Sequence, residues 1–274
     1  MRLGPRSKRL LGYNRAMLGK QDAPLTAEEG RGWRWFPEHG LPRTLLEVLI
    51  ILPAYLVYEL VRGTVSGRTP EAFQRAASLV HVEQTLGIFW EYEFQSLILS
   101  WDVAVRLVNA IYIWGHLPVI IGIAIWLLVF HKHRYPLFRN AFLISGGIGL
   151  FFFWLLPTAP PRFLPHWGFV DTVVTSGTYY IFQPPEFVNQ YAAMPSLHFG
   201  WSLLAAVAIF VHLRTPYRYL LFAFPVLTFG GVVLTANHFF LDAVAGAAVA
   251  MLGLWLAVFL RSRLPRTRLF SVLA

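Results

Sequence analysis

Residues 238–260 read HFFLDAVAGAAVAMLGLWLAVFL, and this stretch decides the fold class. After its first five residues it holds only apolar and small side chains, and a helix of about 20 such residues can cross the roughly 30 Å of hydrocarbon in a bilayer. Similar stretches recur along the chain. Of its 274 residues, 56% are hydrophobic and 14% are charged, whereas a soluble domain carries about 25% charged residues. The sequence therefore predicts an all-α integral membrane protein.

Six membrane helices are expected, and Pro118 marks a kink site in the second. They form a membrane catalytic domain over residues 44–261, between a basic N-terminal segment (1–43) and a basic tail (262–274). The expected spans are about Thr44–Leu60, Val105–Phe130, Leu137–Leu156, Ser196–Leu213, Tyr217–Thr235 and His238–Leu260.

The distribution of basic residues predicts the orientation. Of the 23 Lys and Arg residues, 18 fall before the first span, after the second and fourth spans, or in the C-terminal tail. Because positive charge accumulates on the cytoplasmic side, both termini are expected inside a cell membrane. The net charge of +9 is then a topology signal, and no nucleic-acid partner is expected. No apolar run with a cleavage site follows the basic N-terminus, so no cleavable signal peptide is expected.

Two long segments are expected on the outer side. Residues 62–104 contain two amphipathic stretches, Glu71–Leu86 and Phe89–Leu99, separated by Gly87. We expect both to be short helices lying at the membrane interface. The second segment, Pro157–Pro195, is rich in proline, glycine and aromatic residues and is expected to be an ordered irregular loop.

Three polar motifs are expected to meet on the outer face. They are Pro195-Ser196-Leu197-His198, Asn237-His238 followed by Asp242, and the run from Pro157 to Arg162. The first two open the fourth and sixth spans, and the N-terminus of a helix is an anion site. Two such N-termini with Arg162 nearby would suit a phosphate.

His238 and Asp242 are four residues apart and are expected to share one helix face. Asp242 could then orient the imidazole and leave its other nitrogen as a nucleophile. His198 could act as the general acid toward the departing alkoxide. Other interpretations of this trio are a polar pair that joins helices and a metal site completed by His116 or His166. We expect neither metal nor cofactor, and the absence of cysteine excludes thiolate sites.

Asn109, Tyr112 and His116 lie along one face of the second span, below its outer end. Polar side chains at that depth should face the interior of the bundle. They would either line the site of the substrate head group or form an interhelical hydrogen-bond network.

These motifs resemble those of the type-2 phosphatidic acid phosphatase superfamily, over residues 109–246. The inositolphosphorylceramide-synthase-like branch is the more similar one. The residues that carry the resemblance are Pro157–Pro161, Met194, Pro195-Ser196-Leu197-His198, Asn237-His238-Phe239, Asp242 and Gly246.

The resemblance implies six helices and metal-independent phosphoryl transfer through a phosphohistidine. It makes His238 the nucleophile, Asp242 its orienting partner and His198 the general acid, with Ser196 and Asn237 beside the phosphate. The chain departs from the widespread pattern. Gly231-Val232 replaces a Ser-Arg pair, and the Lys of the first motif has no counterpart. Arg162 is the expected replacement for the missing phosphate clamp.

The sequence leaves several functions open. A transferase would move a phosphoryl or phospho-head group from a lipid to a polyol, sugar or lipid hydroxyl, whereas a lipid phosphate phosphatase would use water. A transporter or a scaffold is the non-catalytic alternative, although no inverted repeat supports transport. The oligomeric state is not readable.

Overall fold

The computed structural model describes residues 43–175, 189–211, 213 and 215–263. Within these ranges the chain is helical, and one isolated bridge joins Thr158 to Ala192. Residues 43–50 group apart from the rest of the chain, and residues 51–263 form the unit that carries the helix bundle and its polar motifs. The basic segment 1–43, apart from its last residue, and most of the basic tail lie outside the described residues.

Among the described residues, five segments are long and apolar enough to cross a membrane, so the chain is a multi-pass membrane protein. They contain α2 (Arg43–Val65), α5 (Asp102–Trp114) with α6 (Leu117–Phe130), α7 (Tyr135–Leu155), η4 (Pro216–Phe222) with α11 (Ala223–Leu234), and α12 (Phe240–Arg263). The fourth expected span is α10 (Leu197–Phe210), whose 14 residues extend only about 21 Å at 1.5 Å per residue. The count of six spans therefore stays a prediction.

The second span is broken rather than continuous. The α5 helix ends at Trp114 and α6 begins at Leu117. Pro118 has no N–H to donate to the carbonyl of Trp114, and its ring would collide with that carbonyl. The kink expected at Pro118 is confirmed, and its effect is to place His116 at the break.

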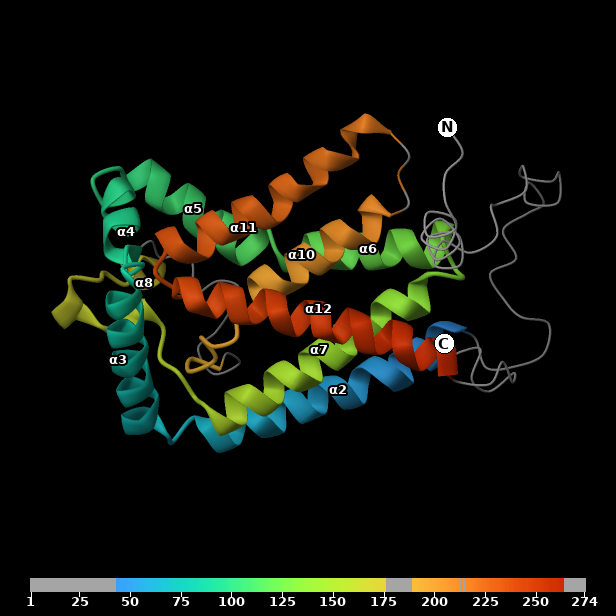
Figure 1. Ribbon diagram of the computed structural model, residues 1–274, viewed down its shortest axis with the longest axis horizontal. Coiled ribbons are helices and arrows are strands. Elements are labelled where there is room, and N and C mark those ends of the chain that lie inside the picture. The colour runs from blue at the N-terminus through green and yellow to red at the C-terminus, as the bar shows by residue number, and fades with distance from the viewer. Residues whose placement is uncertain (1–42, 176–188, 212, 214, 264–274) are drawn as a thin grey trace, which may run out of the picture. The chain divides into compact units, whose positions relative to one another are not determined.

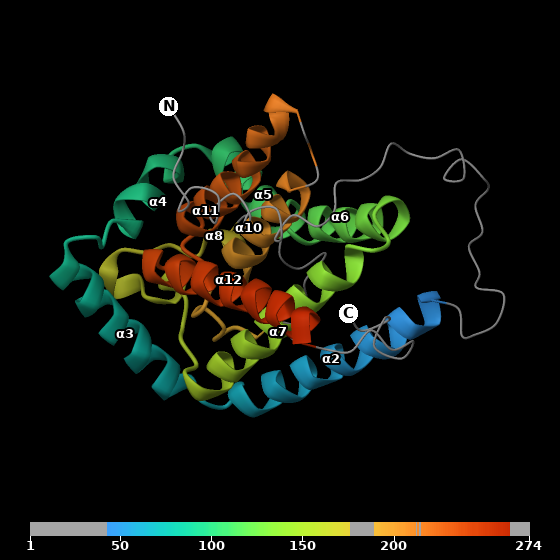
Figure 2. The ribbon, with the colours of Figure 1, turned by 45° about the vertical axis from the view of Figure 1, so that its right-hand side comes forward.

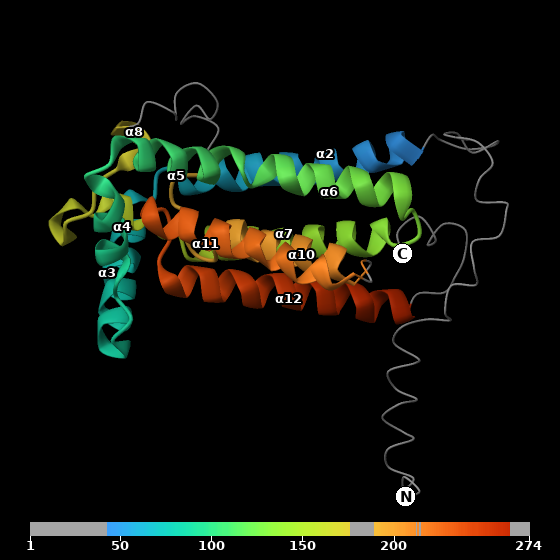
Figure 3. The same ribbon diagram turned by 90° about the horizontal axis from the view of Figure 1, so that it is seen from above.

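The α12 helix packs against α7 and α10, and α10 packs against α11 (Figures 1 and 3). Glycine makes the contact between α10 and α12 possible. A Cβ atom added to Gly246 would lie 2.0 Å from the carbonyl oxygen of Ser196, and one added to Gly200 would lie 2.3 Å from that of Gly246. The two backbones therefore touch where both helices begin.

Two short helices cover the end of the bundle at which α12 begins, α3 (Thr69–Leu86) and α4 (Glu91–Leu99) (Figure 2). The two predicted amphipathic helices are thus confirmed as helices, and their position at the membrane interface stays a prediction. Gly87 ends α3 with φ of 70°, a left-handed conformation that glycine adopts without strain. The buried stripe of α3 consists of Ala72, Ala76, Val80 and Glu83.

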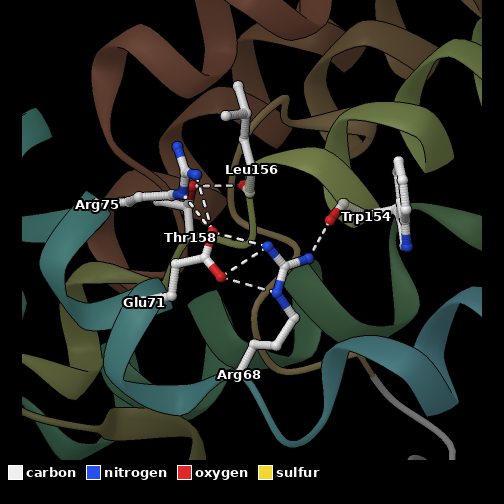
Figure 4. Close-up of polar contacts among 6 residues, drawn as sticks. All are labelled: Arg68, Glu71, Arg75, Trp154, Leu156 and Thr158. Atoms are coloured by element: carbon white, nitrogen blue, oxygen red, sulfur yellow. Dashed lines mark hydrogen bonds and ion pairs between the residues drawn. The ribbon is translucent and has the colours of Figure 1, made fainter.

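Arg68 joins the start of α3 to the end of α7, because its guanidinium binds Glu71 and donates to the carbonyl of Trp154 (Figure 4). Arg75 binds the same carboxylate from one turn further along α3. The segment after α7 forms η1 (Pro161–Phe163), η2 (Pro165–Trp167) and the short α8 (Thr172–Thr175). Residues 176–188 of this segment lie outside the described residues.

Candidate active site

His238 lies in the turn between α11 and α12 and is buried. Its Nδ1 atom is 2.7 Å from the carbonyl oxygen of Ala193, in the segment that leads into α10. A carbonyl oxygen only accepts, so Nδ1 carries the hydrogen and Nε2 keeps its lone pair. The turn itself is made by Ala236, whose φ of 52° is left-handed.

Asp242 is fully buried in the first turn of α12. Its Oδ2 atom accepts a hydrogen bond of 2.8 Å from the backbone N–H of Phe239 and stands 3.5 Å from Nδ1 of His238. Its backbone carbonyl accepts from the N–H of Ser196 at 2.8 Å. The residue therefore binds its own helix start and α10, and it lies beside the imidazole that the sequence expects it to orient.

His198 lies in the first turn of α10 and is partly exposed. Its ring centroid is 5.6 Å from that of His238, 4.6 Å from that of His116 and 4.9 Å from that of Tyr112. The structure thus brings Tyr112 and His116, from the broken second span, to His198, which in turn lies beside His238. His116 is buried, and its Nε2 atom has no hydrogen-bond partner among the described residues.

Ser196 is the N-cap of α10 and is fully buried. Its Oγ atom accepts from the N–H of Phe199 at 3.4 Å. The expected place of Ser196 beside a phosphate is not tested by this contact, which shows only that its hydroxyl helps to satisfy the start of the helix.

Arg162 is buried, and its backbone N–H donates to the carbonyl of Ala236 at 2.8 Å, next to the turn that carries His238. Its guanidinium lies 4.4 Å above the ring of Phe163 and pairs with Asp171 at 2.7 Å. Oδ1 of Asp171 also accepts from the backbone N–H groups of Val173 and Val174, at the start of α8. The expected phosphate-clamp arginine is therefore held near the turn of His238 by the segment between α7 and α8.

Asn109 and Asn237 both donate to protein atoms. The Nδ2 atom of Asn109 donates to the carbonyls of Val105 and Thr172, joining α5 to α8. The Nδ2 atom of Asn237 donates to Oγ1 of Thr235 at 2.7 Å. Both side chains shape the elements around the site, and their contact with substrate stays a prediction.

The start of α12 departs from the expectation of an open anion site. The N–H of Phe240 donates to Oε1 of Glu91 and that of Leu241 to Oε1 of Glu83, each at 2.8 Å. The carboxyl of Asp242 accepts a hydrogen bond from the N–H of Phe239. Because three carboxyl groups already occupy this helix end, a phosphate cannot bind to the same N–H groups.

Two further histidines, His81 of α3 and His166 of η2, are exposed. Among the residues that the structure describes, no group of three or more His, Cys, Asp or Glu side chains is arranged to hold a metal ion.

Sequence reasoning missed Glu83, Glu91, Asp171 and the carbonyl of Ala193. A backbone carbonyl leaves no signal in the sequence. Glu83 does leave one, because it continues the spacing of the apolar stripe Ala72, Ala76 and Val80. A buried carboxyl needs a hydrogen-bond partner. The place of Glu83 in a buried stripe therefore predicts that its carboxyl binds a specific group elsewhere in the chain.

Comparison with known proteins points in the same direction. The model of the PAP2 superfamily matches residues 77–256, which include all the motif residues of α10 and α12. A relative from Bacteroides thetaiotaomicron, described as phosphoinositol dihydroceramide synthase, is 28% identical over 174 residues. That match covers 57% of this chain and 56% of the relative. The chain thus spans only a little over half the length of the relative. No solved structure matches the chain.

Proposed function

Because this chain belongs to the PAP2 superfamily, we propose that it is a membrane lipid phosphotransferase. It moves a phosphoryl or phospho-head group between a lipid phosphate ester or diester and a hydroxyl acceptor. The transfer passes through a phosphohistidine on His238, at the extracytoplasmic face. The similarity to a protein described as a phosphoinositol dihydroceramide synthase supports a transferase rather than a hydrolase.

One observation carries the proposal: the Nδ1 atom of His238 is engaged by the carbonyl of Ala193. The free lone pair is then on Nε2, the nitrogen that can attack phosphorus. A nucleophile is effective when its orientation is set before the substrate arrives. The buried position of His238 between the starts of α10 and α12 supplies that orientation.

The first step forms a bond from Nε2 of His238 to phosphorus and breaks the bond from phosphorus to the lipid oxygen. His198 gives a proton to the departing alkoxide, and in the second step it takes a proton from the acceptor hydroxyl. That hydroxyl attacks phosphorus and releases His238. Arg162 neutralises charge on the phosphate oxygens in both steps.

The site lies at the ends of the helices where α3, α4 and the outer loop gather. The count of basic residues on the opposite connections supports an extracytoplasmic position for this end, with both termini inside. A lipid head group would then reach the site from the outer leaflet.

The test is release of the lipid product from a panel of lipid phosphates and phosphodiesters by purified protein. It is run in EDTA, with and without polyol, sugar or lipid alcohol acceptors. We expect turnover that depends on an acceptor, resists EDTA and is lost in His238→Ala, with a phosphorylated protein trapped when the acceptor is withheld. Exposed His81 is the matched control, and His81→Ala should keep full activity.

Turnover that needs only water would make the protein a lipid phosphate phosphatase. Turnover that persists in His238→Ala would remove the phosphohistidine. No turnover on any lipid would favour a transporter or a scaffold.

A further inference from the structure

Two glutamates from helices that are not part of the membrane spans hold the start of α12. Glu83 of α3 and Glu91 of α4 are fully buried, and each accepts a backbone N–H of the first turn of α12 at 2.8 Å. The N–H groups belong to Leu241 and Phe240, which follow His238 by three and two residues.

The other oxygens of the two carboxyls, Oε2 of Glu83 and Oε2 of Glu91, are buried and have no hydrogen-bond partner among the described residues. Because the two carboxyls accept from the N–H groups of the successive residues Phe240 and Leu241, they gather at the same helix start. Two ionised carboxylates repel each other in such a place unless a proton is shared between them. A buried pair without that proton would place two negative charges side by side, with the carboxyl of Asp242 also acting on both.

We propose that Glu83 and Glu91 are positioning residues that share one proton and hold the first turn of α12, and with it His238, in the geometry for phosphoryl transfer. The inference rests on the proposed function for its catalytic consequence, whereas the held helix rests on the two hydrogen bonds to the start of α12. Neither residue was expected from the motifs.

Electrostatics agrees with this arrangement. Burial, reinforced by the hydrogen bond to Glu91, raises the pKa of Glu83 to about 9, and burial also raises the pKa of Glu91. Glu83 therefore holds the shared proton at neutral pH. The single negative charge left on the pair lies at the start of α12, where the helix dipole favours it.

The pH dependence follows from the raised pKa of Glu83. The folded protein holds a proton that the unfolded chain releases near pH 4.5, so stability falls as pH rises from that range through about 9. The titratable groups that act on the pair are its own two members and Asp242. Above about pH 9 the pair becomes doubly charged and the start of α12 loosens.

The experiment uses the full chain in detergent and compares wild type with Glu83→Gln and Glu83→Leu. Glutamine keeps an oxygen for the N–H of Leu241 and donates to Glu91, so it copies the protonated acid. We expect Glu83→Gln to remove the loss of apparent Tm between about pH 5 and 9, and to keep the amides of residues 239–241 protected from hydrogen exchange. Leucine should expose those amides and lower turnover by about 100-fold, as a misplacement near 1 Å does.

Glu93→Gln, on the exposed face of α4, is the matched control and should keep the wild-type pH dependence. An apparent Tm that falls equally in wild type and Glu83→Gln would overturn the shared proton. Unchanged amide exchange in Glu83→Leu would overturn the role in holding α12. Both measurements are made without substrate, so they stand apart from any failure of the proposed lipid chemistry. If Glu83→Leu does not fold, the comparison of wild type with Glu83→Gln still decides.

Discussion

The Nδ1 atom of His238 hydrogen-bonds to the backbone carbonyl of Ala193, 45 residues earlier in the chain, while the carboxylate of Asp242 stands 3.5 Å away. The tautomer of the candidate nucleophile is therefore set by a loop carbonyl. Asp242 acts mainly on the helix start that carries it, through the N–H of Phe239.

This relationship predicts the tautomer directly. In the resting protein at neutral pH, the imidazole of His238 should carry its hydrogen on Nδ1 and none on Nε2. The measurement is ¹⁵N NMR of histidine-labelled protein in detergent, with the signal assigned by its loss in His238→Asn. A hydrogen found on Nε2 would contradict the arrangement.

The same geometry predicts a moderate effect for Asp242→Asn. Asparagine keeps an oxygen for the N–H of Phe239, so apparent Tm should fall less than in Asp242→Ala, which loses a cap worth about 0.5–2 kcal/mol. Turnover should fall by much less than the roughly 10⁴-fold seen where a carboxylate alone sets the tautomer. Calorimetry and steady-state kinetics on both variants make the comparison, and a loss of that full size in Asp242→Asn would return the orienting role to Asp242.

The close packing between α10 and α12 predicts that replacing a glycine by alanine is harmful at this contact and harmless away from it. In Gly246→Ala the new methyl would lie 2.0 Å from the carbonyl oxygen of Ser196, so the helices must separate. We expect a loss of stability of about 1–3 kcal/mol or more and loss of activity, because His198 and His238 are carried by the two helix starts.

Gly147→Ala, within α7, is the matched control, since its added methyl meets nothing within 4 Å. It should be neutral or stabilising by about 0.5–1 kcal/mol, because alanine favours a helix interior. Thermal unfolding in detergent separates the two variants. Equal behaviour of both would show that the backbones are not in contact.

The contacts of Arg162 predict that its planar guanidinium, and not only its positive charge, is needed for activity. Arg162→Lys keeps the charge but loses the planar group that lies over Phe163 and pairs with Asp171. A charge-assisted hydrogen bond contributes about 1.5–3 kcal/mol, so kcat/KM for a lipid phosphate should fall roughly 10- to 100-fold.

Arg75→Lys is the control, because Arg75 is more than a third exposed and pairs with Glu71 on its own helix, α3. Exposed ion pairs contribute little, so its kinetics should stay close to wild type. Equal kinetics for the two variants would remove Arg162 from the phosphate site.

Periodic and local features were predictable from the sequence. The apolar stretches predicted the long helices within a few residues, Pro118 predicted the break in the second span, and Gly87 predicted the end of α3. These features depend on side-chain hydrophobicity and on the backbone preferences of single residues, and neither needs tertiary contacts. The motifs at 195–198 and 237–242 likewise predicted that His198 and His238 lie where helices begin, and their part in catalysis stays a prediction.

Only the tertiary structure decided which groups the histidines and helix starts bind. The hydrogen bond from His238 to Ala193 joins residues 45 apart, and those from the start of α12 to Glu91 and Glu83 span 149 and 158 residues. Backbone carbonyls and N–H groups are the same at every position, so no residue pattern records which distant partner they will meet. The sequence thus determined the helices and the polar side chains at their starts, and packing determined the hydrogen-bond partners that orient those side chains.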